Sequence, residues 1–401
     1  MHFLVNDWRD DRCVVRVCRL GFTKQGRDGA RPSNLLRSLL YKWMTLSERP
    51  LRLSPQPCLS WAAAVASRME DRFGHRISYL RVSVTDRCNE RCTYCMPQEL
   101  QEWLPRHDIL TFEETLRLIR IATELGVTKI RLTGGEPLTR RDVIRLFRQL
   151  PGLTNLRDIG LSTNGTLLTR EVEPGLTMVE AVRACGFRSI NVSLDTLDRA
   201  EYARVTGRDL LPQTIAGIEA AVAAGFPQVK INCVLMRGRN EKQLAALVDF
   251  AAERNLLLRF IELMPVSTTD VLTEDNFLPV AEARRALEAK FGPFIPEPEF
   301  KTNGPASYYQ LPGRNQRIGF IGAMTNLHFC ESCNKLRLTC DGKLRPCLGS
   351  YLEFDIMQPL RAGASDEELR RFFLDVVERK PEQHDFRTTY QPCRKMVAIG
   401  G

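Results

Sequence analysis

The sequence predicts an α/β fold in which an incomplete (βα)6 barrel of the TIM type is followed by a small C-terminal unit. Two observations predict the barrel. From residue 79 onward, short β-rich runs alternate with longer amphipathic segments, as in chains whose parallel strands are joined by helices. In addition, Gly126, Gly186 and Gly225 each follow an amphipathic segment, where the C-terminus of a helix favours a residue that tolerates positive φ.

Six barrel strands are expected. The first is Y-L-R-V-S-V at residues 79–84, and the others lie at 128–133, 157–162, 189–194, 229–234 and 258–263. The segment at 112–125 is apolar at i, i+3, i+4 and i+7, which predicts a helix between the first two strands. Right-handed crossovers of this kind give a parallel sheet. In such barrels the chemistry lies at the C-terminal ends of the strands.

The pattern changes after about residue 270. A helix is expected at 279–291, a strand at 317–322 and a last helix at 366–378. Asp341-Gly342 is a strong two-residue turn signal, so the run at 336–348 predicts a hairpin. We therefore expect a barrel domain over 69–270 and a C-terminal region over 271–401.

The first 68 residues differ from the rest of the chain. They hold 12 Lys or Arg against 5 Asp or Glu, whereas the remaining 333 residues hold 45 against 43. They show no sustained period, and Asp7, Asp10 and Asp11 argue against a transit peptide. We interpret residues 1–68 as a disordered basic extension, or as sequence upstream of a true start at Met69.

Composition narrows the class of protein. A chain of 401 residues with 43% hydrophobic and 26% charged residues is typical of a globular protein. No apolar run reaches the roughly 18 residues of a membrane helix, and the nearly neutral body argues against a nucleic-acid-binding face. Thirteen cysteines without a secretory signal indicate a reducing, cytoplasmic location and metal ligation rather than disulfides.

The most informative motif is T-D-R-C-N-E-R-C-T-Y-C-M-P at residues 85–97, which follows the first strand. Cys88, Cys92 and Cys95 are spaced C-x3-C-x2-C, which gives three thiolates where a [4Fe–4S] cluster normally takes four. One iron is then open to a ligand that is not protein, as cleavage of S-adenosylmethionine (SAM) to a radical requires. The alternative is structural zinc, which prefers four closed ligands. The nearest downstream histidine is His107, twelve residues past the last cysteine.

Further polar and sulfur-bearing residues follow other predicted strands. The second strand runs into L-T-G-G-E-P, whose glycines allow a close approach to a ligand and whose Glu136 offers a carboxylate to the SAM amino group. Ser193 and Asp195 end the fourth strand, and Met264 ends the sixth. Their shared position at strand ends favours a functional role over filling of the barrel.

A second cysteine triplet lies in the C-terminal region. Cys330, Cys333 and Cys347 again provide three ligands, while Cys340 lies between the last two. Cys340 is either a fourth ligand of a closed site or points away from the other three. In the second case another iron is open, and it is available to a nitrogen or oxygen of a substrate.

These motifs together resemble the GTP 3′,8-cyclases, the radical-SAM enzymes of molybdopterin (molybdenum cofactor) biosynthesis. The resemblance rests on the first motif, R-L-T-G-G-E-P-L, N-V-S-L-D, the run F-C-E-S-C-N-K-L-R-L at 329–338 and the terminal Gly400-Gly401, and covers about residues 69–401. It implies a partial radical-SAM barrel with a small C-terminal Fe–S unit, two [4Fe–4S] clusters and SAM. The implied reaction abstracts hydrogen from C3′ of GTP and joins C3′ to C8 of guanine, giving (8S)-3′,8-cyclo-7,8-dihydroguanosine 5′-triphosphate.

The resemblance also implies residue roles. Cys88, Cys92 and Cys95 would bind the SAM cluster, and Cys330, Cys333 and Cys347 the second cluster. Contacts to SAM fall on Tyr94, Gly135, Ser193 and Met264. Contacts to GTP fall on Arg81, Arg131, Ser162, Lys230, Lys335 and Arg337, and the catalytic tail is Gly400-Gly401.

Two observations bear on these implied GTP contacts. The first supports them: Arg81, Arg131 and Lys230 lie in predicted strands, where a charge is costly unless it is paired or faces a polar lumen. Internal ion pairs with Glu262 or Asp195 are the alternative. The second is a departure, because Lys335 stands where the family usually has arginine and lacks the bidentate fork.

The resemblance also implies partners: GTP, a reductase or a flavodoxin or ferredoxin as electron donor, a downstream cyclic pyranopterin monophosphate synthase and a homodimer. Two other functions stay open on the sequence. A peptide-modifying radical-SAM enzyme with an auxiliary cluster would carry more C-terminal cysteines. A zinc-stapled binding module would leave the residues at the strand ends without a role.

Overall fold

The computed structural model describes residues 2–9, 12–19, 69–97, 99, 102–268, 272–302, 304–387, 390, 392 and 394–400. The chain divides into two units, Met1–Ala64 and Val65–Gly401. In the first unit, β1 (His2–Arg9) pairs antiparallel with β2 (Arg12–Arg19), a hairpin that the aperiodic sequence does not predict. The rest of residues 1–68 lies outside the described residues, so both interpretations of this segment stay predictions.

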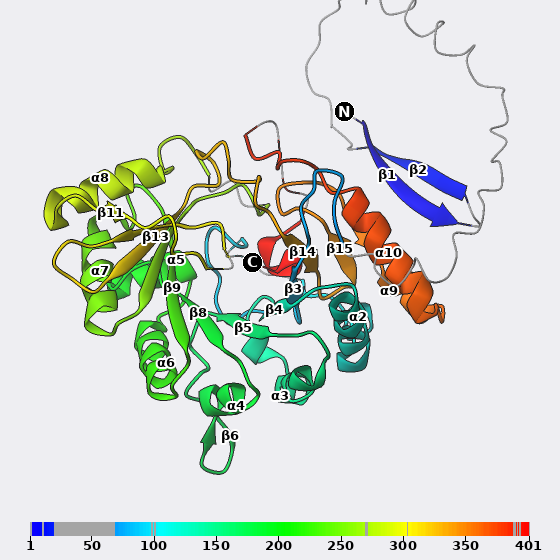
Figure 1. Ribbon diagram of the computed structural model, residues 1–401, viewed down its shortest axis with the longest axis horizontal. Helices are drawn as coiled ribbons and strands as arrows, with labels where there is room; N and C mark the ends of the chain where they lie inside the picture. The colour runs from blue at the N-terminus through cyan, green and yellow to red at the C-terminus, as the bar shows by residue number, and fades with distance from the viewer. Residues whose placement is uncertain are drawn as a thin grey trace, which may run out of the picture. The chain divides into compact units, whose positions relative to one another are not determined.

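The second unit is built on one curved sheet (Figure 1). Its centre consists of six parallel strands that lie side by side in chain order. They are β3 (Tyr79–Ser83), β4 (Lys129–Thr133), β5 (Asp158–Thr163), β8 (Ser189–Ser193), β9 (Gln228–Leu235) and β10 (Leu257–Glu262). Each lies within a residue or two of its predicted range, which confirms the incomplete barrel.

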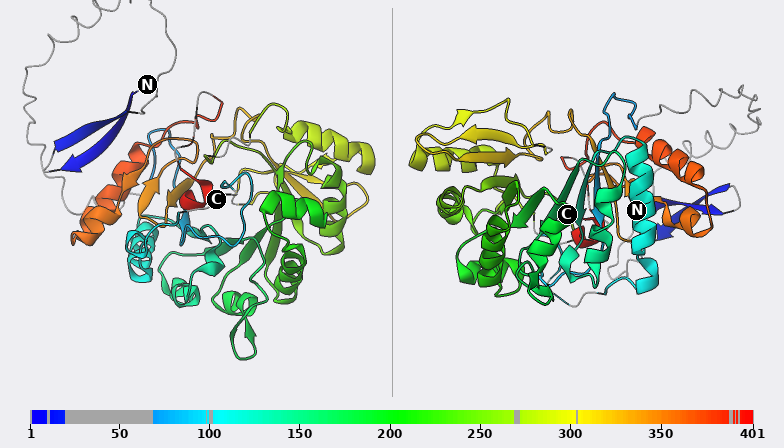
Figure 2. Two further views of the ribbon diagram at one scale, coloured as in Figure 1. Left: turned by 180° about the vertical axis from the view of Figure 1, so that it is seen from behind. Right: turned by 60° about the horizontal axis from the view of Figure 1, so that its bottom comes forward.

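Helices cover the outer face of this sheet (Figure 2). The first, α2 (Phe112–Glu124), begins with a capping box between Thr111 and Glu114 and buries Leu118, Ile121 and Ala122 against the strands. The helices that follow are α3 (Val143–Phe147), α4 (Met178–Ala184), α5 (Arg199–Thr206), α6 (Leu211–Ala223), α7 (Leu244–Glu253) and α8 (Val280–Phe291). A small hairpin of β6 (Glu171–Glu173) and β7 (Leu176–Thr177) precedes α4.

The C-terminal region extends the barrel sheet at both edges. On one edge β13 (Arg317–Ile321) pairs parallel with β10, followed outward by β12 (Ser307–Gln310) and β11 (Ile295–Pro296). On the other edge β14 (Lys335–Leu338) pairs parallel with β3, followed by β15 (Lys343–Arg345) and β16 (Phe354–Asp355).

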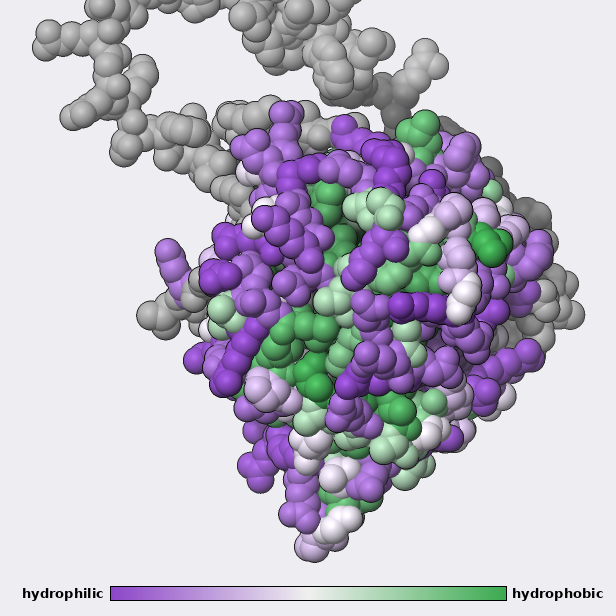
Figure 3. All heavy atoms as spheres, turned by 90° about the vertical axis from the view of Figure 1, so that its left-hand side faces the viewer, coloured by the Kyte–Doolittle hydropathy of each residue, from purple (hydrophilic) through white to green (hydrophobic). Residues whose placement is uncertain are grey.

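Figure 3 shows the side of α7, α8 and β11, where hydrophilic side chains predominate and hydrophobic patches are separate.

The predicted hairpin is present, but its turn differs. The connection between β14 and β15 is the four-residue turn Thr339–Gly342, in which the Gly342 amide donates to the Thr339 carbonyl and Gly342 adopts a φ of 69°. Three helices complete the region: α9 (Met357–Arg361), α10 (Asp366–Glu378) and α11 (Met396–Ile399). The last of these lies in the middle of the barrel in all ribbon views, between the sheet edges (Figures 1 and 2).

Candidate active site

One cavity of about 350 Å³ fills the lumen and mouth of the barrel. Side chains from β3, β4, β5, β8, β9, β10 and β14 line it, together with both cysteine triplets. Every residue named above for cluster, SAM or GTP contacts lines this cavity, whereas Gly400 lies behind its wall and Gly401 lies outside the described residues. Those residues are Arg81, Cys88, Cys92, Tyr94, Cys95, Arg131, Gly135, Ser162, Ser193, Lys230, Met264, Cys330, Cys333, Lys335, Arg337 and Cys347.

The first triplet lies on the loop after β3, and its first member, Cys88, is five residues past the end of that strand. The Cys95 amide donates to the Cys92 carbonyl at 2.9 Å, and Thr93 donates to the carbonyl of Val205 at the end of α5. Burial, together with Glu136, raises the pKa of Cys88 far above its ordinary value. A cationic partner is therefore needed to hold this sulfur as a thiolate.

The three thiols suit a cluster better than a single ion. Among the described residues, no group of three or more Cys, His, Asp or Glu side chains converges as the ligands of one metal ion do. A [4Fe–4S] cluster binds each thiolate through a different iron, so its ligands need not meet at one point. Cys88, Cys92 and Cys95 all line one cavity, as the three protein ligands of such a cluster would.

The phenol of Tyr94 joins the first triplet to the end of β8. It donates to Oδ2 of Asp195 at 2.7 Å, and the other carboxylate oxygen accepts from the Val234 amide at 2.8 Å. Burial raises the pKa of Asp195 to about 6 despite these donors. Asp195 therefore fixes the ring of Tyr94, and the alternative in which it pairs with a lumen arginine is wrong.

The G-G-E segment after β4 packs closely against the cysteine loop. A Cβ on Gly135 would lie 2.1 Å from the Arg87 carbonyl oxygen, and one on Gly134 would lie 2.8 Å from that of Thr85. Both positions therefore require glycine, and the predicted contact with SAM stays a prediction. The Glu136 carboxylate accepts from Leu138, Thr163 and Asn164, and burial raises its pKa to about 7.

Basic side chains line the inner face of the strands. Parallel pairing places Arg81 beside Arg131 across β3 and β4, and beside Arg337 across β3 and β14. The Arg131 guanidinium donates at 2.8 Å to three oxygens, those of the Tyr79 hydroxyl, the Leu161 carbonyl and the Ser189 hydroxyl. Among the described residues, no carboxylate forms an ion pair with Arg131, so its charge remains available to an anion.

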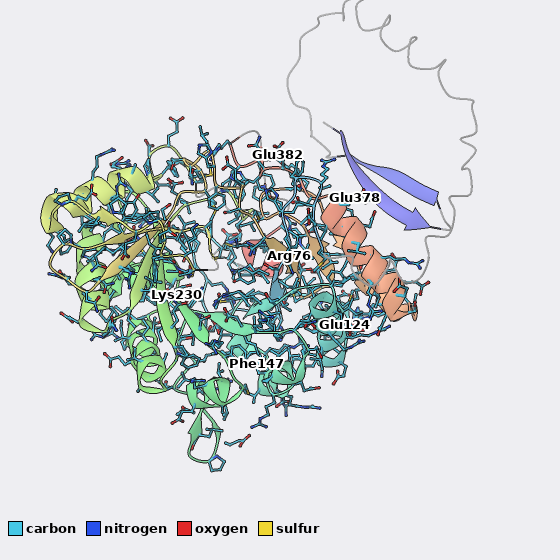
Figure 4. All side chains as sticks on the ribbon, in the orientation of Figure 1. Arg76, Glu124, Phe147, Lys230, Glu378 and Glu382 are labelled. Carbon is cyan, nitrogen blue, oxygen red and sulfur yellow. The ribbon has the colours of Figure 1, made fainter. Side chains whose placement is uncertain are left out.

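Lys230 lies on β9 within the barrel (Figure 4). It is 3% exposed, and burial together with Arg259 and Arg131 lowers its pKa to about 6. The alternative of an ion pair with Glu262 is wrong, because that carboxylate accepts from Val280, Met324 and Thr325. None of the salt bridges in the described part of the chain involves Arg81, Arg131 or Lys230.

The cavity is also lined by two cations that the sequence reasoning missed, Lys129 on β4 and Arg259 on β10. Lys129 forms an ion pair with Asp158, whereas Arg259 donates twice to the side-chain oxygen of Asn232, at 2.9 and 2.6 Å. Both could have been noticed in the sequence, because both are charged residues inside predicted strands. The argument that a charge in a strand must be paired or face a polar lumen, which supported Arg81, applies equally to them.

Tyr79 is the other lumen residue that was missed. Its ring lies 5.4 Å from Lys129 Nζ and 5.8 Å from Lys335 Nζ, and its hydroxyl accepts from Arg131. Burial raises its pKa, but Arg131, Arg81 and Lys129 outweigh burial and lower the pKa to about 7. Tyr79 therefore supplies the cations with a partly anionic neighbour.

The second triplet faces the same cavity from the C-terminal region. The Cys333 amide donates to the Cys330 carbonyl at 2.9 Å, and burial raises the pKa of Cys347 to about 11. Burial opposes the thiolate of Cys333 too, yet Lys380 and Lys335 bring its pKa below the ordinary value. Cys340 is fully buried and does not line the cavity, so its side chain is separate from the triplet.

The C-terminal tail closes the site. In α11, Met396 places its sulfur 3.7 Å from that of Cys95, and its amide donates to the Cys95 carbonyl at 3.2 Å. The carbonyl of Gly400 accepts from Arg337 Nη1 at 2.6 Å. Gly400 has a φ of 76°, and a Cβ there would lie 3.1 Å from side chains of Ser83 and Thr133.

Comparison with protein families matches both parts of the chain. Residues 82–251 match the radical SAM superfamily, and residues 256–386 match the family described as Molybdenum Cofactor Synthesis C. Solved structures share the fold. SuiB of Streptococcus suis gives a TM-score of 0.52 at 17% identity, covering 78% of this chain and 68% of that one. Native anSMEcpe with bound AdoMet gives 0.52 at 14%, covering 77% and 82%.

Curated relatives are much closer in sequence. A GTP 3′,8-cyclase of Pelotomaculum thermopropionicum is 41% identical over 333 residues, which cover 83% of this chain and 100% of that protein. One of Paracoccus denitrificans is 45% identical over 339 residues, covering 82% and 95%. None of the helices in the described part of the chain has the length and apolar character that a membrane crossing requires. The chain therefore belongs to the GTP 3′,8-cyclase family of radical SAM enzymes, which act in molybdenum cofactor synthesis.

Proposed function

We propose that the two cysteine triplets each hold a [4Fe–4S] cluster and that GTP binds between them. The observation that carries this proposal is the shared cavity, because two incomplete ligand sets open into one lumen whose wall is basic. Triphosphate is the anion that such a wall suits, since charge-assisted hydrogen bonds from Arg and Lys are strong in a desolvated site. The cations are Arg81, Lys129, Arg131, Lys230, Arg259, Lys335 and Arg337.

The chain's own residues divide the work. Cys88, Cys92 and Cys95 would hold the cluster that supplies one-electron cleavage of SAM when bound. Tyr94, Gly135, Ser193 and Met264 line the cavity and would contact SAM; Tyr94 is kept in place by Asp195. Cys330, Cys333 and Cys347 would hold the second cluster, which would supply an open iron to the guanine. Ser162 contacts GTP beside Arg131.

With these contacts the ribose of GTP lies between SAM and the guanine. The hydrogen at C3′ would pass to the 5′-deoxyadenosyl group released from SAM, C3′ would join C8, and one electron from the donor with one proton would complete the cyclised dihydro-GTP. Water is excluded because the barrel, the cysteine loop and α11 surround the cavity. The tail ending in Gly400-Gly401 takes part in this step, and the Gly400 carbonyl on Arg337 supports that role.

Three further assignments belong to the same proposal. A reductase, a flavodoxin or a ferredoxin supplies the electron, and a cyclic pyranopterin monophosphate synthase consumes the product. The enzyme works in the cytoplasm as a homodimer. The nine cysteines from Cys88 to Cys347 are free, which accords with a reducing compartment.

The proposed reaction is tested by anaerobic reconstitution with iron and sulfide, followed by SAM, a reductant and GTP. We expect 5′-deoxyadenosine to form only when GTP is present. Formation at the same rate without GTP would argue against the cyclase. A titration with GTP should also perturb the spectrum of the second cluster, whereas a peptide-modifying enzyme would show no such change. A colourless protein containing zinc would favour the binding module.

The role of the tail has its own test. Gly401→Ala, or one residue added after Gly401, should abolish turnover while both clusters remain intact by iron content and absorbance. Full turnover of either variant would refute the role of the tail.

A further inference from the structure

The tail is held where it enters the barrel by a network of ion pairs on the edge hairpin. Arg394 Nη1 donates to both carboxylate oxygens of Glu353, each at 3.0 Å, and Nη2 donates to Asp341 Oδ2 at 2.8 Å. Arg345, which is 1% exposed, forms an ion pair with Glu353 as well and donates to the Ser350 carbonyl at 2.8 Å. The network therefore involves the β14–β15 turn and the segment before β16.

This network lies immediately before α11 in the chain. Arg394 precedes Met396, the first residue of α11, by two positions, and it precedes Gly400 by six positions. The tail is thus fixed at both ends, by the carboxylates at Arg394 and by Arg337 at the Gly400 carbonyl. Between them, Val397 and Ile399 are 6% and 2% exposed.

The side chain of Arg394 has the properties of an anchor. Its exposed fraction is 19%, and those of Asp341 and Glu353 are 13% and 19%, so the pairs are shielded from solvent. Charge-assisted bonds to two carboxylates in such a place are stronger than a surface pair. Nothing in the network touches the cavity, so its influence on the reaction passes through the tail.

We propose that Arg394, clamped by Asp341 and Glu353, is a positioning residue that sets the place of the C-terminal tail in the active site. This inference rests on the proposed function of the tail. The clamp fixes α11 against the Cys95 carbonyl and holds the Gly400 carbonyl on Arg337. When the clamp is broken, α11 separates from the cysteine loop, and Arg337 loses a partner inside the lumen.

The test uses full-length, cluster-reconstituted protein carrying Arg394→Met. We expect the amides of residues 396–399 to exchange with deuterium about tenfold faster or more, since the loss of a shielded ion pair lowers the free energy of local opening by more than about 1.4 kcal/mol. We expect kcat to fall by about tenfold or more while the melting temperature and iron content change little. Arg371→Met is the matched control, because Arg371 makes an exposed pair with Glu367 on α10.

A second pair of variants keeps the test sharp if Arg394→Met is poorly folded. Arg394→Lys retains the charge but lacks the fork, and Asp341→Asn removes one carboxylate; both should show the same local exchange at a smaller amplitude. Unchanged exchange at 396–399 in these variants would overturn the proposal.

The failure of the clamp and the failure of the tail's role give different results. If Gly401→Ala is inactive but Arg394→Met exchanges and turns over as the control does, the clamp is refuted and the tail's role stands. If Gly401→Ala is fully active, the tail's role is refuted, and the positioning role of Arg394 is refuted with it.

Discussion

Lys230 shows at the scale of one residue how the lumen is kept ready for an anion. In the ligand-free protein its pKa is lowered to about 6 by burial, Arg259 and Arg131, whereas an unfolded chain holds that proton up to roughly pH 10.4. Between these values the unfolded state binds the extra proton, so this group makes the free energy of unfolding rise with pH. A bound triphosphate would raise the pKa of Lys230 again, so the binding of GTP would be accompanied by the uptake of a proton.

The variant Lys230→Met should therefore stabilise the cluster-free protein while weakening its binding of GTP. We expect its free energy of unfolding in urea at pH 6 to exceed that of the unmodified chain by about 1 kcal/mol or more, and this gain to shrink toward pH 9. Its KM for GTP should rise about tenfold or more. Lys242→Met, at an exposed position, is the control. An equal gain at both pH values would contradict this account of Lys230.

Gly160 gives a prediction that leaves every charge in place. A Cβ on Gly160 would lie 2.5 Å from Arg131 Nη2 and 2.8 Å from Ser189 Oγ. Gly160→Ala should displace the guanidinium and raise the KM for GTP, at a cost of about 1–3 kcal/mol in stability from overpacking. Steady-state kinetics and thermal unfolding measure both effects. Gly152→Ala, with open space around its Cβ, should change neither, and an unchanged KM in Gly160→Ala would mean that Arg131 is not a GTP contact.

Single residues also show how far sequence reasoning reaches. A charge inside an apolar, β-rich run is visible without a structure, and this signal supported Arg81, Arg131 and Lys230, which the family resemblance had implied. It would have found Arg259 and Lys129 if it had been applied to every strand. Tyr79 could not be found in this way, because a tyrosine is ordinary in a strand and its role depends on neighbours from β4 and β14.

At the scale of elements, α2 and α10 lie side by side (Figure 1) and are joined by ion pairs. Asp366, at the start of α10, accepts from Arg117 at 2.8 Å and Arg120 at 2.5 Å. Its hydrogen bond to Arg120 lowers its pKa, against a smaller effect of burial. The stability it contributes is present above its unfolded pKa and is lost as pH falls through its lower folded pKa.

Asp366→Asn should therefore cost about 1 kcal/mol at pH 7, a value reduced for the partial exposure of the pairs. The difference from the unmodified chain should vanish at the acid end of the titration, which urea unfolding at several pH values would measure. Turnover should stay within about twofold because neither helix lines the cavity. Glu367→Gln is the control. An equal loss in free energy of unfolding in that variant would show that the ion pairs of Asp366 stabilise the fold no more than an exposed pair does.

The elements divide into those that the sequence predicts and those that it does not. The six barrel strands are recognisable because each is a short β-rich run between amphipathic helices. The attachment of β13 to β10 and of β14 to β3 depends on pairing between distant segments, which no local pattern encodes. The same is true of α11, whose four residues have no periodicity and whose place depends on Arg394 and Arg337.

At the scale of the whole molecule, the metal content distinguishes one cluster from two. Reconstituted protein should hold about eight irons per chain and no zinc if each triplet binds a [4Fe–4S] cluster. Cys347→Ala should lower this to about four, while Cys340→Ala should leave it unchanged because Cys340 does not line the cavity. Iron and zinc analysis measures all three. A loss of iron in Cys340→Ala would make Cys340 a fourth ligand.

The pairing of β14 with β3 determines how late in synthesis the edge of the barrel sheet at β3 can be covered. Tyr79 pairs with Lys335, so 256 residues must be synthesised before the free edge of β3 is covered. At the usual 5–20 residues per second, that edge stays open on the ribosome for about 13 to 51 s. An uncovered parallel strand invites wrong pairing, and long-range contacts of this kind form slowly. The growing chain thus carries Cys88, Cys92 and Cys95 for most of translation before β14 covers the edge of the strand that precedes them.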